Sequence, residues 1–160
     1  MTSSPPIWSH LVRIAIVALL WIRPVYADNV LAVMYFDIQS EDTRLQRLRV
    51  GLAEMMTTDL ARVDGFEVVE RKELAALLAE QDLGASGRID QSTAVEIGQL
   101  LGAHYMVFGS GFDLFGTLRL DVRVVDVETG AIVSTGSAEG PPKELIEMKG
   151  SLVESISTWM

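Results

Sequence analysis

The sequence predicts an α/β fold: a mixed sheet of about five strands with helices packed on it, ending in an antiparallel meander. Two observations support this prediction. In the first half, short apolar runs typical of strands alternate with segments whose apolar residues recur every three or four positions, as in helices. In the second half, apolar and polar residues alternate with a period of two, which is typical of strands with one buried face.

The first predicted strand covers residues 30–38 (VLAVMYFDI) and is almost continuously apolar. Such a run is typical of a strand buried on both faces, near the centre of a sheet. Asp42 or Thr43 can then cap a helix by accepting a backbone N–H. This helix is predicted over 44–63, and Gly65 provides a left-handed residue that ends it. Its apolar face consists of Leu45, Leu48, Leu52, Met56 and Leu60.

A second short strand is predicted over 66–70, and a second helix begins near Arg71. Gly84 and Gly87 open a loop, and Asp90 caps a third helix over 91–101. Two helices between the second and third strands make a crossover long enough for parallel pairing.

The last three strands are joined by turns too short for anything but antiparallel pairing. They are predicted over 105–114, 118–124 and 131–138, with the turns at 115–117 and 128–130. Pro141 and Pro142 then introduce a final helix over 143–159, since proline is tolerated in the first turn of a helix.

The N-terminal residues 1–27 have the pattern of a signal peptide. Arg13 precedes the apolar run 14–22, and residues 25–27 (VYA) place small side chains at the positions that a signal peptidase reads. The run is too short to span a bilayer, which needs roughly 20 residues. We therefore expect a signal peptide over 1–27 and a single periplasmic domain over 28–160, without a membrane span after cleavage. The alternative is an uncleaved anchor.

Charge and cysteine content narrow the function classes. The chain has 13 basic and 22 acidic residues, and cleavage after Ala27 would remove two arginines, so the mature charge would be 11 − 22 = −11. An acidic surface repels phosphate backbones, which excludes nucleic acids as partners. No cysteine is present, which excludes disulfides, thiolate metal sites and a lipid anchor attached through cysteine.

The residues do not supply the groups that catalysis needs. Of the two histidines, His10 falls in the predicted signal peptide, and His104 alone is too little for a metal site or a catalytic triad. Ser110 lacks the glycine pattern of a nucleophile elbow, and no phosphate-binding loop is present. We predict no catalytic residue, no metal site and no cofactor.

Two groups of polar residues are candidates for contact with a ligand or partner. Asp37 ends the first predicted strand, and Glu70 and Arg71 end the second. The two strands would be parallel, and ligands of open α/β sheets bind at that edge. An Asp37–Arg71 ion pair or a helix cap that fixes the strand–helix turn is the alternative interpretation. The second group is Arg119, Asp121 and Arg123, a candidate docking face; such alternating charges also serve solvation or protect a sheet against edge pairing.

Two segments carry a family resemblance: 65–81 (GFEVVERKELAALLAEQ) and 93–109 (TAVEIGQLLGAHYMVFG). Their order and spacing resemble the CsgG-like periplasmic domains, which include the curli secretion channel, FlgO-type flagellar proteins and the amino-terminal domain of TolB. The strand at 30–37 and the turn at 126–130 also lie where that family has them. The resemblance implies an anticodon-binding-domain-like α/β fold.

The resemblance also implies a function: a non-catalytic accessory domain of a Gram-negative periplasm, assisting assembly or secretion of a cell-surface or envelope structure. Its partners would be envelope or secretion-complex proteins, with self-association because resembling channels form rings. The curli channel adds two membrane hairpins, for which the links at 115–117 and 139–140 leave no room, so we expect no pore. The alternative is a small-ligand or nucleotide-binding sensor near Asp37 and Arg71.

Overall fold

The computed structural model describes residues 29–80 and 91–159. The predicted signal peptide, the loop containing Gly84 and Gly87, and the predicted cap Asp90 lie outside the described residues. None of the helices in the described part is long and apolar enough to cross a membrane.

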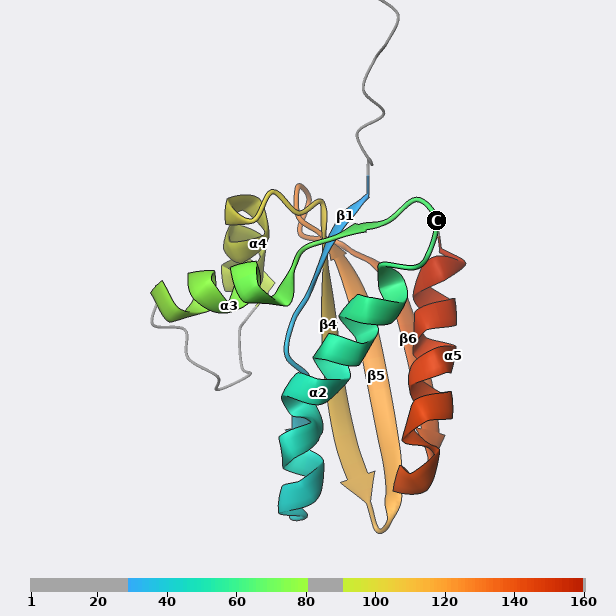
Figure 1. The fold of residues 1–160 in the computed structure, drawn as a ribbon. Helices are drawn as coiled ribbons and strands as arrows, with labels where there is room; N and C mark the ends of the chain where they lie inside the picture. Colours follow the sequence, from blue (N-terminus) through green and yellow to red (C-terminus); the bar gives the residue numbers. More distant parts are fainter. Residues whose placement is uncertain (1–28, 81–90, 160) are drawn as a thin grey trace, which may run out of the picture.

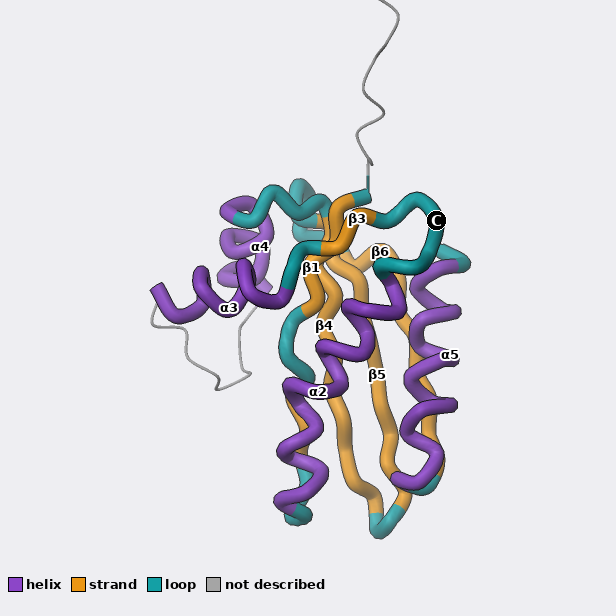
Figure 2. Tube along the Cα trace, viewed as in Figure 1, coloured by secondary structure: helices purple, strands orange, loops and turns teal. Residues whose placement is uncertain are grey.

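A mixed sheet forms the centre of the fold, with the strand order β3-β1-β4-β5-β6 (Figures 1 and 2). β1 runs parallel to both of its neighbours, whereas β4, β5 and β6 form an antiparallel meander. The predicted mixed sheet with a C-terminal meander is therefore confirmed. The strands are β1 (Val30–Val33), β2 (Asp37–Gln39), β3 (Glu67–Val68), β4 (Tyr105–Leu114), β5 (Thr117–Asp126) and β6 (Ile132–Gly140).

The first predicted strand is divided in two, so the sheet has six strands instead of about five. β1 and β2 both pair with β4, but between these pairings the chain advances four residues, from Val33 to Asp37, while β4 advances three. The extra residue makes a bulge. At the bulge the buried Phe36 ring lies on Gly109, where a Cβ would come within 2.2 Å of the ring. This long-range contact explains why a continuous apolar run does not form one continuous strand.

The helices begin and end close to where the sequence predicts. They are α2 (Thr43–Leu60), α3 (Arg71–Glu80), α4 (Gln91–Leu100) and α5 (Leu145–Ser157), the last preceded by a 3-10 turn over Pro142–Glu144. Asp42 caps α2, because its Oδ1 accepts the Arg44 N–H at 2.8 Å. After α2, Gly65 has φ +92°, the left-handed backbone predicted for this position.

Helices α2 and α5 cover one whole face of the sheet (Figure 1). Lys149 of α5 also forms an ion pair with Asp59 of α2, which joins the two helices at the edge of this core. The sheet contributes buried side chains to this core from β1, β2, β4 and one face of β5. Those of the two helices and of β5 include Leu52, Met56, Leu60, Met148, Leu152, Ile156, Leu118, Leu120, Val122 and Val124.

Helices α3 and α4 cover only half of the opposite face. Their apolar side chains pack on Met106, Phe108 and Val125, near one end of β4 and β5. The β4–β5 hairpin extends away from them, so the rest of this face has no helix above it (Figure 2). We call this region the open half-face. Its residues are Asp37, Gln39, Ser110, Phe112, Leu114, Arg119, Asp121, Arg123, Thr135, Ser137 and Glu139.

Candidate functional site

The strand register arranges the open half-face in rows across the sheet. In one row, Asp37 of β2 lies opposite Ser110 of β4, which lies opposite Asp121 of β5, which lies opposite Ser137 of β6. Directly opposite residues share a face of the sheet. Asp37 therefore lies on the same face as Asp121, so one surface holds members of both groups of candidate residues.

The neighbouring rows place charged and aromatic side chains on either side. Towards the hairpin tip, Phe112 lies opposite Arg119, which lies opposite Glu139. Towards α3 and α4, Phe108 lies opposite Arg123. The predicted docking residues Arg119, Asp121 and Arg123 thus lie in three consecutive rows along β5.

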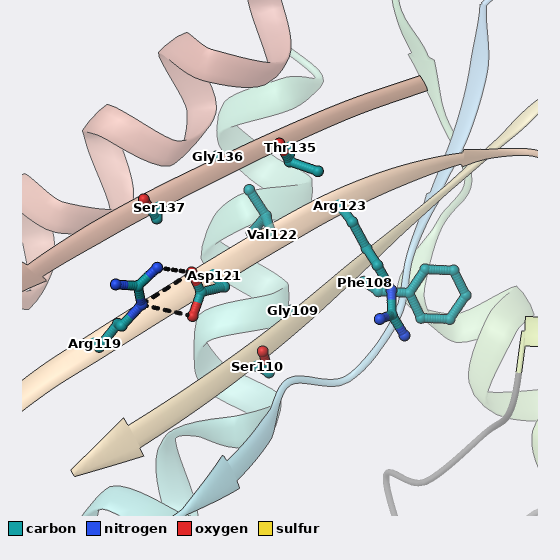
Figure 3. Close-up of a pocket in the computed structure, with 10 residues that line it drawn as sticks. All are labelled: Phe108, Gly109, Ser110, Arg119, Asp121, Val122, Arg123, Thr135, Gly136 and Ser137. Carbon is teal, nitrogen blue, oxygen red and sulfur yellow. Dashed lines mark hydrogen bonds and ion pairs between the residues drawn. The ribbon is translucent and has the colours of Figure 1, made fainter. Parts of the chain in front are cut away.

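Arg119 is held by carboxylates. Its Nε lies 3.2 and 3.1 Å from the two oxygens of Asp121, and its Nη2 lies 2.9 Å from Oδ1 (Figure 3). Its Nη1 is 3.9 Å from Glu139 Oε2. The hydrogen bonds to Asp121, and then its negative charge, raise the pKa of Arg119 above its usual value. Because Arg119 is 45% exposed, this pair adds little to stability, and it mainly fixes the orientation of both side chains.

Arg123 is placed differently. Its guanidinium carbon lies 5.2 Å from the centroid of the Phe108 ring, an aromatic contact that leaves the N–H groups available (Figure 3). Within residues 29–80 and 91–159, no carboxylate forms an ion pair with Arg123. Arg123 is therefore an exposed cation that can receive a carboxylate from outside.

A shallow groove of about 390 Å³ lies between these side chains (Figure 3). The hydroxyl groups of Ser110, Thr135 and Ser137 line it together with the two arginines and Asp121. These groups donate and accept hydrogen bonds and form ion pairs. The lining has no histidine or cysteine, and its carboxylate, Asp121, is held in an ion pair by Arg119. The arrangement is suited to binding.

The other candidate group does not assemble as predicted. Asp37 begins β2 instead of ending the first strand, and Gln39 Nε2 is 3.5 Å from its Oδ2. The side chain of Glu70 is exposed. The backbone carbonyl of Glu70 accepts the N–H groups of Glu73 and Leu74 at the start of α3. No Asp37–Arg71 ion pair is present among the described residues.

Arg71 instead fixes the junction of strand and helix. Its Nη1 donates to the Val33 carbonyl at 2.6 Å, and its guanidinium lies 4.2 Å from the centroid of the Tyr35 ring. Val33 is the last residue of β1, so Arg71 binds the carbonyl where the chain leaves the sheet. Arg71 thus fixes the turn between strand and helix, but not through an ion pair with Asp37. Its Nε is buried without a hydrogen-bond partner in the described structure.

The apolar end of the open half-face was not predicted from the sequence. Phe112 is 37% exposed, Leu114 is 53% exposed and Phe115 is fully exposed at the turn between β4 and β5. A signal was present in the sequence: Phe-Gly stands where hairpin turns of two residues prefer Asn-Gly or Asp-Gly.

A model of the family described as the curli production assembly/transport component CsgG matches residues 28–114. This span contains β1 to β4 and α2 to α4. No curated protein sequence is similar enough to count as a match.

Solved structures show the same fold over most of the chain. The LpoB C-terminal domain from Escherichia coli is 22% identical with a TM-score of 0.58, over 79% of this chain and 93% of that domain. TolB from Acinetobacter baumannii is 17% identical with a TM-score of 0.56, over 82% of this chain and 28% of TolB.

A PelC dodecamer from Paraburkholderia phytofirmans is 14% identical to the chain, with a TM-score of 0.51, over 86% of this chain and 91% of a PelC chain. At these identities the likeness establishes the fold. The family model matches more than half of the sequence, and it confirms the resemblance carried by residues 65–81 and 93–109. The chain belongs to the CsgG family.

Proposed function

We propose that this chain is a non-catalytic accessory domain that works in the periplasm of a Gram-negative bacterium by binding envelope proteins. The description of its family, curli production assembly and transport, supports a role in building or exporting a cell-surface structure. The predicted signal peptide over 1–27 would bring it to the periplasm. The dodecamer formed by PelC supports self-association as part of that role.

The observation that carries this proposal is the open half-face. A half-covered antiparallel sheet normally presents polar side chains to water. Here the uncovered surface combines hydroxyl groups and an oriented ion pair with exposed Phe112 and Leu114. A mixed surface of this kind, with aromatic and arginine side chains, is typical of protein interfaces.

Site-specific photo-crosslinking in living cells tests the proposal. A photo-reactive amino acid at Thr135, which is exposed on the open half-face, should capture envelope proteins. The matched control is Ser151, which is exposed on α5 over the opposite face, and it should capture few. Equal capture from both positions, or none from Thr135, would contradict the proposal, as would recovery of the uncleaved chain in the cytosol.

The groove favours a second candidate function, a sensor for a small anionic ligand. Two guanidinium groups and three hydroxyl groups line its 390 Å³, which is within the size range of small-molecule sites. Screening anionic metabolites by thermal unfolding separates the candidates, because a ligand that binds only the folded state raises the melting temperature. A melting temperature unaffected by every metabolite, together with crosslinks from Thr135, would favour the accessory domain.

A further inference from the structure

Phe115 occupies a position that a β-hairpin normally gives to Asn, Asp or Gly. Leu114 pairs with Thr117, so the turn has two residues, and both have positive φ: 52° at Phe115 and 89° at Gly116. These signs identify a type I′ turn. A bulky L-residue is strained there, and the Phe115 side chain is also fully exposed. Folding alone gains nothing from an aromatic residue at this position.

The turn that carries Phe115 is held in one shape. Asp113 Oδ1 accepts the Gly116 N–H at 3.0 Å, and Asp113 Oδ2 accepts the Ser40 hydroxyl at 3.2 Å. These bonds tie the hairpin tip to the segment after β2. A side chain presented on a fixed backbone loses less freedom on binding than one on a mobile loop.

Phe115 does not stand alone. Phe112 and Leu114 are exposed on the adjoining part of the open half-face, and we call the three residues together the apolar tip. Single exposed apolar residues are normal on protein surfaces. Three neighbours at the end of an uncovered sheet form a patch, and patches mark interaction sites.

Arg123 lies at a defined distance from this patch. Arg123 and Arg119 are four residues apart on β5, and Arg119 is opposite Phe112. At roughly 3.4 Å per residue, Arg123 is about 14 Å from the row that begins the apolar tip. A partner that contacts both must carry its carboxylate and its apolar side chains about this far apart.

The other charges on the open half-face limit how acidic the partner can be. Asp121 is neutralised by Arg119, but Asp37 and Glu139 also lie on this face. A run of acidic residues would meet these carboxylates and be repelled. A single carboxylate directed at Arg123 avoids them.

We propose that the open half-face binds a segment of an envelope protein with one carboxylate for Arg123 and apolar side chains for the apolar tip. The separation corresponds to about four residues in an extended segment or about nine in a helix. This inference rests on the proposed function and adds the chemistry of the partner.

Selection from a random peptide library displayed on phage, with the purified mature protein as bait, tests the pairing. Selected peptides should carry one Asp or Glu and an aromatic or aliphatic residue at the stated spacing. R123Q should weaken binding of such a peptide about tenfold or more. R123Q should have little further effect once the peptide carboxylate is replaced by an amide, because the two groups act as one contact.

Phe115→Asn tests the apolar tip without the risk of unfolding. It should weaken peptide binding about tenfold or more while raising the melting temperature, since Asn suits the turn. R47Q on α2 and I146Q on α5 are matched controls, because both residues are exposed and lie outside the open half-face. Both controls should leave peptide binding unchanged.

Three outcomes would overturn this inference. The selected peptides could lack a carboxylate, they could bind R123Q and wild type equally, or no peptide could be selected for the open half-face. The proposed function is tested separately by the crosslinks from Thr135. Crosslinks to an envelope protein that persist in R123Q and F115N would overturn the inference and leave the proposed function standing. Absence of crosslinks from Thr135 would overturn both the proposed function and this inference.

Discussion

The two faces of β5 differ in what lies above them. On one face, Leu118 and Leu120 are fully buried beneath α2 and α5. On the other, Arg119 and Arg123 are exposed on the open half-face. The backbone hydrogen bonds of β5 to β4 and β6 belong to neither face. The difference in burial therefore comes from the side chains and from the helices that cover them. Along β5, the buried side chains lie mostly on the α2/α5 face, so that face supplies most of the strand's stabilising apolar contact.

This division explains how the fold can hold an exposed apolar patch. A sheet already fixed on one face by a continuous core does not need its second face for stability along its whole length. Helices α3 and α4 complete the second face only around Met106, Phe108 and Val125. Beyond Phe108, the residues of β4 on this face become progressively exposed, from Ser110 to Leu114, and are free to serve binding.

The largest expected effect comes from comparing one leucine on each face. Leu152 of α5 has no exposed surface, and Leu152→Ala should lower the free energy of unfolding by about 3 kcal/mol. Leu114 is 53% exposed at the apolar tip, and Leu114→Ala should change the free energy of unfolding by less than about 0.5 kcal/mol. Chemical denaturation of both variants measures the difference. Equal losses would mean that the open half-face is covered in the folded protein.

A second prediction concerns the bulge that divides the first strand. Gly109→Ala would bring a methyl group within 2.2 Å of the buried Phe36 ring, and this overpacking should cost about 2 kcal/mol. Gly150 provides the control: it is exposed in α5 with nothing within 4 Å of an added Cβ, and Gly150→Ala should stabilise the protein by about 1 kcal/mol. A Gly109→Ala variant as stable as wild type would show that Phe36 moves without cost.

Local sequence patterns predicted the elements, and long-range contacts decided the details. The alternation along β5 predicted one buried and one exposed face, as found. The division of the first strand was missed, because it depends on Phe36 meeting Gly109, 73 positions later, and the apolar run gives no sign of that contact. The spacing of apolar residues along one segment indicates which face is buried, but it does not indicate which distant residues pack against that face.

The same limit applies to the candidate site. The sequence placed Arg119, Asp121 and Arg123 on one exposed face, and the structure does too. The sequence also predicted that Asp37 and Arg71 lie together at one edge of the sheet, because each ends one of two strands expected to be parallel. The extra residue before Asp37 carries that carboxylate past the end of β1 onto the open half-face, and Arg71 binds the Val33 carbonyl left at the break.

A third prediction isolates the strain at the apolar tip. The left-handed backbone of Phe115 costs an ordinary L-residue roughly 1–2 kcal/mol, a cost that Asn largely avoids. Phe115→Asn should therefore raise the free energy of unfolding by about 1 kcal/mol. Phe115→Ala is the matched control, because it removes the exposed ring and keeps the strain. If Asn and Ala give equal stability in denaturant unfolding, the strain is not what distinguishes this position.

The smallest expected effect comes from the turn at the other end of β5, which contrasts with the tip. There Gly130 takes the positive φ, +69°, and Asp126 Oδ1 accepts the Thr129 N–H at 2.7 Å and the Thr129 hydroxyl at 2.8 Å. The backbone hydrogen bond, and then that of the hydroxyl, lowers the pKa of Asp126 below its ordinary value. The folded state therefore favours the ionised carboxylate.

Since the folded pKa of Asp126 is below the unfolded one, its stabilising contribution is complete above the unfolded pKa and is lost as pH falls through the folded pKa. Asp126→Asn should thus lower the melting temperature slightly at neutral pH, and the difference from wild type should shrink below about pH 4. Thermal unfolding between neutral and acid pH measures this. If the difference in melting temperature stays constant with pH, the charge of Asp126 does not stabilise its turn. The contrast with the strained apolar tip would then come from Gly130, which takes the positive φ without strain.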